Sequence, residues 1–324
     1  MAEYRSQHYV PRAYLAGFAD EVALNGKGVW VYERGGTGAY SSSPKKVAVS
    51  EYYYSFENEA GQKDHAIEKL LGKTEDRAIP LLRELAGGRD VSALSPEQRE
   101  WVAVFLGYMS VRIPGFRKNV EASMAEVMTL VGKMAASQPK YFERTMREAA
   151  RAAGKELTQD PEEVRQFVLR GEYEVTTNPA FSLAMMLEMG LKVAEYILNF
   201  EWRVLDTDGD LFITSDRPVV LVATEKAPFP FNGAGWLTPN MEATFPLSPK
   251  ACLLISLHHP AGRERIASAQ VAEINLRTSA HADLAVFASR NFDVRNLAPP
   301  LGWTWWNPVT AAVRADWLAA MRVD

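Results

Sequence analysis

Cysteine is nearly absent from this sequence, since the 324 residues contain only Cys252. A single cysteine cannot form an intramolecular disulfide, and it cannot supply a zinc ribbon or an iron–sulfur centre. It lies in the apolar run Cys252-Leu253-Leu254-Ile255, where we expect a small buried hydrophobe and not a nucleophile. Any chemistry should therefore come from histidine, glutamate, arginine and aspartate.

An excess of positive charge and long apolar runs are also missing. Lys and Arg number 36 against 40 Asp and Glu, so the formal net charge is −4 and no global basic field can hold a nucleic acid. The net charge does not exclude a local basic cleft. No stretch reaches the roughly 18 uninterrupted apolar residues of a membrane span, and residues 1–8 lack an apolar signal core. We therefore expect a cytoplasmic protein with no membrane partner.

Two common site motifs are lacking as well. The glycine-rich stretches 26–28 and 35–38 do not have the strand, helix and lysine context of a phosphate loop. Ser215 is not part of a Gly-x-Ser-x-Gly elbow, which argues against a serine hydrolase. Neither nucleotide binding by a phosphate loop nor a serine nucleophile is therefore predicted.

The middle of the chain has the apolar spacing of helices. It predicts a helix over 64–85, and Ser95 followed by Pro96 and Gln98 predicts a capped helix start. Further helices are expected near 116–135, 139–153, 161–169, 180–199, 271–282 and 310–321, the last after a tryptophan-rich segment, 303–306.

Short β-rich runs lie on both sides of this helical middle. They are expected at 29–33, 51–54, 202–205, 211–214, 218–222, 242–245, 251–256 and 284–288, with a hairpin turn at 208–210. The fold class is therefore α+β, with a mixed or antiparallel sheet formed by N-terminal and C-terminal strands and packed against helices. We expect one large domain in which a helical subdomain, about 64–199, is inserted between β-rich segments 1–63 and 200–324.

Five short motifs occur in a specific order along the chain. They are His8-Tyr9-Val10-Pro11, Ile67-Glu68, Arg112-Ile113-Pro114, Thr214-Ser215-Asp216-Arg217-Pro218 and Phe245-Pro246-Leu247-Ser248-Pro249. In this order and spacing the sequence resembles the family called domain of unknown function 4238, from His8 to about Asn291. The usual form of the fourth motif has an asparagine where this chain has Arg217, so the role of that side chain is left open. The resemblance implies candidate residues but no mechanism.

His8 and Glu68 are the first two candidates for catalysis. An imidazole titrates near neutrality and can act as a general acid, a general base or a metal ligand. The alternative is that His8 only holds the N-terminal segment in place. Glu68 can share one helix face with Asp64 and Glu75, which we expect to be structural, and its selection depends mainly on the resemblance.

Arg112 and Asp216 complete the predicted site. Arg112 follows an apolar helix and could bind a carboxylate or phosphate, or it could pair with Glu68 or Asp216. Asp216 follows a predicted strand, where it could be catalytic, bind a metal, or form a turn.

These residue types favour a hydrolase, either a nuclease or a nucleotide hydrolase, acting on a phosphodiester or another anionic substrate. His8 would be the general acid or base and Arg112 would neutralise negative charge. Glu68 and Asp216 would orient His8 or bind a divalent cation, Mg²⁺ or Mn²⁺. The partner of such a hydrolase would be a small anionic ligand or a nucleic acid.

The alternative is a non-catalytic ligand-binding or regulatory module in which the four residues form a structural ion-pair network. The oligomeric state does not follow from the sequence.

Overall fold

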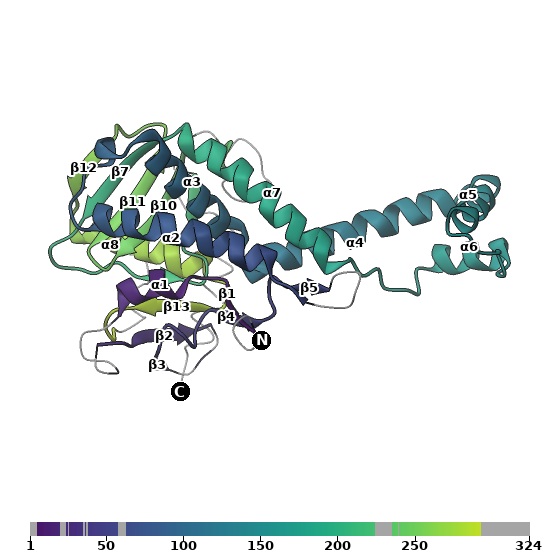
Figure 1. Ribbon diagram of the computed structural model, residues 1–324, viewed down its shortest axis with the longest axis horizontal. Helices are drawn as coiled ribbons and strands as arrows, with labels where there is room; N and C mark the ends of the chain where they lie inside the picture. Colours follow the sequence, from purple (N-terminus) through teal and green to yellow (C-terminus); the bar gives the residue numbers. More distant parts are fainter. Residues whose placement is uncertain are drawn as a thin grey trace. The chain divides into compact units, whose positions relative to one another are not determined.

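The computed structural model describes residues 5–19, 24, 26–34, 36, 38–57, 63–223, 235–238 and 240–292. The fold is α+β, as predicted (Figure 1). It divides into two compact units, one formed by residues 1–114 with 186–324 and the other by residues 115–185. The single large domain stays a prediction. The expected terminal helix at 310–321 and the tryptophan-rich segment 303–306 lie outside the described residues.

The larger sheet of the first unit is built from the last third of the chain. Its strand order is β12-β7-β11-β10-β9, and all neighbouring strands are antiparallel except the parallel pair β12 and β7, so the sheet is mixed. The strands are β7 (Glu201–Asp206), β9 (Val220–Ala223), β10 (Met241–Ser248), β11 (Ala251–Ser256) and β12 (Gly262–Arg265).

Helices cover both faces of this sheet. Leu253 and Ile255 of β11 point into the core that contains α2 and α3, whereas Cys252 and Leu254 pack with residues of α8. Figure 1 shows α2 (Ala66–Ala86) and α3 (Pro96–Val111) across one face, and α8 is Ser268–His281. Because β11 is buried on both faces, its sequence is continuously apolar.

Cys252 is fully buried in this layer, and burial raises the pKa of its thiol to about 12. The thiolate is therefore suppressed, which agrees with the expected structural role.

The smaller sheet joins the two ends of the chain, as predicted. Its order is β3-β2-β13-β8, formed by β2 (Val29–Glu33), β3 (Ala39–Ser42), β8 (Thr214–Ser215) and β13 (Ala285–Ala288). The hairpin expected at 208–210 is wrong, because β8 pairs with β13 and not with β7. Instead, Phe212 donates its N–H to the Pro249 carbonyl at 2.8 Å, and Ile213 donates its N–H to Asn275 Oδ1 at 3.0 Å.

The N-terminal segment docks onto both sheets. It consists of β1 (Ser6–His8), α1 (Arg12–Leu15) and the 3-10 turn η1 (Ala16–Phe18). The Tyr14 hydroxyl lies 2.8 Å from Thr214 Oγ1 and donates to the Pro246 carbonyl at 2.7 Å. Strand β1 pairs with β4 (Val49–Glu51), and β5 (Phe56–Glu57) pairs with β6 (Lys63–Asp64). The strand expected at 51–54 is wrong except for Glu51, because residues 52–54 form a turn.

Helix α3, which ends beside the candidate site, starts and packs as its sequence dictates. Ser95 Oγ accepts from the Gln98 N–H at 3.2 Å, and Gln98 Oε1 accepts from the Ser95 N–H at 3.1 Å. A Cβ added at Gly107 would lie 2.2 Å from the Gly190 carbonyl oxygen, so only glycine permits this close approach of α3 to α7. The short turn η2 (Val91–Ala93) precedes the helix.

The second unit is helical. It contains most of α4 (Pro114–Ala136), with α5 (Pro139–Ala152), α6 (Pro161–Arg170) and the first turns of α7 (Pro179–Leu198). Asp160 Oδ1 accepts from the Glu162 N–H at 3.2 Å and caps α6. None of the helices in the described part of the chain is both long and apolar enough to cross a membrane.

Candidate acid–base site

Arg112 lies at the C-terminal end of α3 and is only 1% exposed. Its Nε donates to the Tyr9 carbonyl at 2.9 Å, and its Nη1 lies 2.9 Å from Glu75 Oε1. Its Nη2 is buried and has no hydrogen-bond acceptor among the described residues. The pairing of Arg112 with Glu68 or Asp216, considered from the sequence, is therefore wrong, because Glu75 takes that position.

Glu68 lies in the first turn of α2, two helical turns before Glu75 on the same face. Its pKa is raised to about 7, mainly because the half-buried carboxyl loses hydration and further because the Glu75 carboxylate repels its charge. The Arg112 guanidinium lowers the pKa but does not cancel these effects. Glu68 forms no hydrogen bond or ion pair with another described residue. This carboxyl is therefore free to exchange a proton near neutral pH.

His8 is the last residue of β1, and its imidazole feels the charge of Glu75 in α2. Its Nε2 lies 3.2 Å from the Pro44 carbonyl oxygen, which can only accept, so Nε2 carries the hydrogen and the lone pair of the neutral ring is on Nδ1. Burial lowers the pKa of His8, the Pro44 backbone opposes this effect, and so does the Glu75 carboxylate. The ring is therefore a neutral base at physiological pH.

Tyr54 contacts the backbone of His8 from the interior of the protein. It is fully buried, its hydroxyl donates to the His8 carbonyl at 3.3 Å, and its N–H donates to Gln7 Oε1 at 2.6 Å. Gln7 Nε2 in turn donates to Ser55 Oγ at 3.0 Å, and Ser55 Oγ lies 3.0 Å from Nδ1 of His65, at the start of α2. No local pattern indicated that Tyr54 belongs to this cluster, since its partners lie more than 40 residues away in the chain.

Asp216 belongs to a different set of contacts. Its carboxylate accepts the N–H groups of Asp283 at 3.0 Å and Leu284 at 2.6 Å, and so it anchors the turn before β13. Burial and, to a smaller extent, the Asp283 carboxylate raise its pKa to about 6. Arg217 Nη1 lies 3.5 Å from Asp283 Oδ1, which gives the arginine a role in this turn.

Tyr9 connects the two sets of residues. Its carbonyl accepts from Arg112, whereas burial and then the Asp216 carboxylate raise the pKa of its hydroxyl. The structure therefore gathers His8, Glu68 and Arg112 around Glu75, and places Asp216 on the other side of Tyr9. Catalytic roles for the four residues stay a prediction.

The chain matches a family model over residues 6–292, and the family is described as Protein of unknown function (DUF4238). The chain belongs to this family. No curated protein and no solved structure matches it.

The Asp216 contacts of this DUF4238 member give a testable expectation. Asp216→Asn replaces one of the two accepting oxygens by an amide that cannot accept, so we expect the free energy of unfolding to fall by about 2 kcal/mol. Urea unfolding measures the change. The matched control is Asp208→Asn, whose exposed carboxylate pairs with Arg265 and should change stability by less than about 0.5 kcal/mol. Equal stability of the two variants would contradict the anchoring role.

A divalent cation has no evident place in the described part of this DUF4238 chain. Within those residues, no group of three or more His, Cys, Asp or Glu side chains is arranged to hold a metal ion. Glu68 and Asp216, the ligands considered from the sequence, belong to separate sets of contacts, and the oxygens of Asp216 are engaged by backbone N–H groups.

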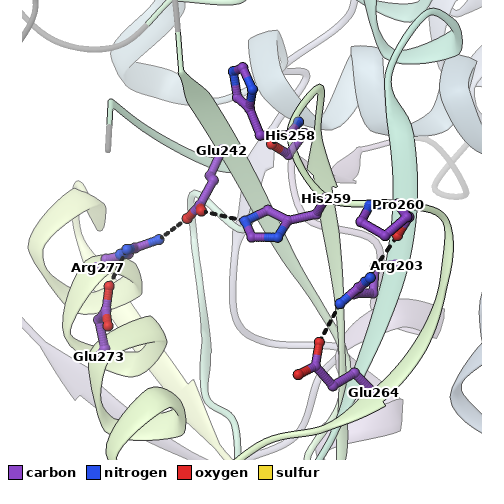
Figure 2. Close-up of polar contacts among 9 residues, drawn as sticks. Arg203, Glu242, His258, His259, Pro260, Glu264, Glu273 and Arg277 are labelled. Atoms are coloured by element: carbon purple, nitrogen blue, oxygen red, sulfur yellow. Dashed lines mark hydrogen bonds and ion pairs between the residues drawn. The ribbon is translucent and has the colours of Figure 1, made fainter. Parts of the chain in front are cut away.

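A second polar cluster of the DUF4238 member lies between β10 and α8 (Figure 2). Glu242 accepts from His259 Nε2 at 3.1 Å and from Arg277 Nη1 at 2.8 Å, and Arg277 also pairs with Glu273. These contacts join the helix to the sheet. His258 is exposed, as expected for a surface residue.

A cavity of about 210 Å³ lies apart from both clusters. Phe212, Asn275 and Phe292 are among its lining residues, and none of the four predicted site residues lines it.

Proposed function

We propose that this protein is a hydrolase of a phosphodiester or another anionic substrate, and that His8, Glu68 and Arg112 carry the reaction. One observation supports this most strongly: Glu68 is a half-buried carboxyl with no hydrogen-bond or ion-pair partner among the described residues, beside a Glu75–Arg112 ion pair. A carboxylic acid held near its pKa at neutral pH is suited to proton transfer.

The proton movements follow from the protonation states of the free groups. His8 Nδ1 takes a proton from a water molecule, and the oxygen of that water attacks the phosphorus atom. Glu68 gives its proton to the leaving oxygen as the P–O bond breaks. The reaction leaves a protonated imidazole and a carboxylate, and one proton transfer through solvent restores both groups.

The surrounding charges favour an anion. The positive charge of Arg12 lowers the pKa of His8, so a cation acts on the space around the imidazole. Arg112 also retains its Nη2 amino group, which has no acceptor among the described residues. In this proposal Arg112 holds Glu75 in place and stabilises the Glu68 carboxylate after it has lost its proton.

The alternative is a ligand-binding or regulatory module whose ion pairs are structural. The burial of Arg112 and its two internal bonds favour this alternative, as do the backbone contacts of Asp216. A buried ion pair holds segments together without any chemistry.

His8→Ala separates the two functions. For a hydrolase we expect turnover of bis(p-nitrophenyl) phosphate or of a dinucleotide to fall about a hundredfold, because the base that activates water is lost. The melting temperature should fall by no more than about 2 °C, since one partly exposed hydrogen bond is removed. Each assay is run with Mg²⁺, with Mn²⁺ and with a chelator.

The control for His8→Ala is His258→Ala, which removes an exposed imidazole. It should change neither turnover nor melting temperature. If the unsubstituted protein hydrolyses none of the substrates, and His8→Ala lowers the melting temperature by several degrees, the structural alternative is correct.

A further inference from the structure

Helix α4 in the unit 115–185 presents large apolar side chains to solvent. Val127, Met128, Leu130, Val131 and Met134 are between 53% and 61% exposed, and Ala136 is the only buried residue of this helix. Isolated exposed apolar residues are normal, but five within eight positions of one helix form a patch of the kind that marks an interaction site.

The patch continues as a stripe along the helix. A helix turns by about 100° per residue, so eight residues of α4 lie within about 60° of the direction of Val127. None is charged: Phe116, Val120, Ser123, Met124, Val127, Leu130, Val131 and Met134. An uncharged stripe with spacings of three and four residues is the pattern by which one helix packs on another.

The contacts of α4 with the end of α6 and with α7 lie away from the centre of the stripe. A Cβ added at Gly132, about 140° around the helix from Val127, would lie 3.6 Å from the Tyr173 hydroxyl that follows α6. Glu121, about 120° away, accepts from Ser182 of α7 at 3.0 Å. Within this unit, the stripe is therefore open.

We propose that this stripe is a dimer interface, in which α4 packs antiparallel against α4 of a second copy. The charges on one flank point to that occupant. Glu126 and Lys133 are seven residues apart on the same side of the stripe. In an antiparallel pair related by a two-fold axis, each flank faces the same flank of the other helix, so Glu126 lies opposite Lys133 of the second copy, twice.

Other arrangements lack this complementarity. A parallel pair would place Glu126 beside Val131 of the second copy and Lys133 beside Gln138. A membrane surface would favour a polar face rich in lysine and arginine, but α4 carries Glu121 and Glu126 among its three basic residues, Arg117, Lys118 and Lys133. The antiparallel helix pair both buries the apolar stripe and pairs the opposite charges on its flank.

The test is the mass of the full chain in solution. Sedimentation velocity over a range of concentrations should show a reversible dimer of the 36.1 kDa chain. Leu130→Glu places a charge in the middle of the stripe and should abolish the dimer. Circular dichroism should show an unchanged helix content, because Leu130 is exposed.

Charge reversal tests the antiparallel register. Glu126→Lys should weaken the dimer roughly tenfold, because two attractive contacts become repulsive, and the double variant Glu126→Lys with Lys133→Glu should restore it. The control is Lys118→Glu, on the side of α4 away from the stripe, which should have no effect. A monomer at all concentrations, or a dimer that neither Leu130→Glu nor Glu126→Lys weakens, overturns the proposal. Flotation of a monomeric chain with anionic vesicles would assign the stripe to a membrane surface and also overturn it.

Discussion

Replacement of Arg112 by methionine is expected to lower the free energy of unfolding by about 3 to 5 kcal/mol. The side chain is 1% exposed, and its loss leaves the Glu75 carboxylate and the Tyr9 carbonyl without their donors. An unpaired charge that cannot hydrate fully is among the strongest causes of destabilisation by a single substitution. Urea unfolding measures the change, and the melting temperature should fall by on the order of 8 °C.

Two further variants determine the origin of this effect. Arg144→Met removes an arginine of the same size from an exposed pair with Glu148, and it should change stability by less than about 1 kcal/mol. The double variant Arg112→Met with Glu75→Leu removes both charges and should be more stable than Arg112→Met alone. A loss below about 1 kcal/mol for Arg112→Met would contradict the bonding described for the guanidinium.

Glu68→Gln is expected to lower the turnover of a phosphodiester about a thousandfold, because the amide has the same shape but cannot supply the proton of a general acid. The same substitution should stabilise the fold at alkaline pH. A carboxyl whose pKa is raised from its ordinary value to about 7 binds more protons in the folded state. The unsubstituted protein therefore loses stability as the pH rises from about 4.5 to about 7.

The glutamine variant does not have this loss. Because the carboxyl is partly hydrated, we expect a gain of only about 1 kcal/mol above pH 7 and no difference below pH 4. Glu100→Gln, at an exposed position on α3, is the control and should leave both turnover and stability unchanged. A glutamine variant that is less stable at pH 8 would contradict the raised pKa, and one with full turnover would contradict the role of Glu68.

Local signals in the sequence were sufficient to predict the long helices of the described residues. The capping box at Ser95 and the Asp160 cap specify helix starts through contacts within three residues, and the structure contains both. The strand partners depend on distant residues. The expected hairpin at 208–210 does not form, because Phe212 and Ile213 bond to Pro249 and Asn275 instead.

The candidate site was predictable to a similar extent. The seven-residue spacing of Glu68 and Glu75 follows from helix geometry, so their common face could be expected. The choice of Glu75 as the partner of Arg112 depends on how α2 packs against α3, and no local pattern contains this information. The same holds for Asp216, whose backbone donors lie 67 and 68 residues away.

The pKa of Glu68 is the most direct test of the proposed acid–base site. Carbon-13 NMR of glutamate side-chain carboxyls, titrated from pH 3 to pH 9, resolves the value, and Glu68→Gln assigns the signal by its absence. We predict a midpoint near 7, as burial and the Glu75 carboxylate require. A midpoint near the ordinary glutamate value of about 4.3 would contradict the account, because Glu68 would then be an ionised surface carboxylate with no proton to give at neutral pH.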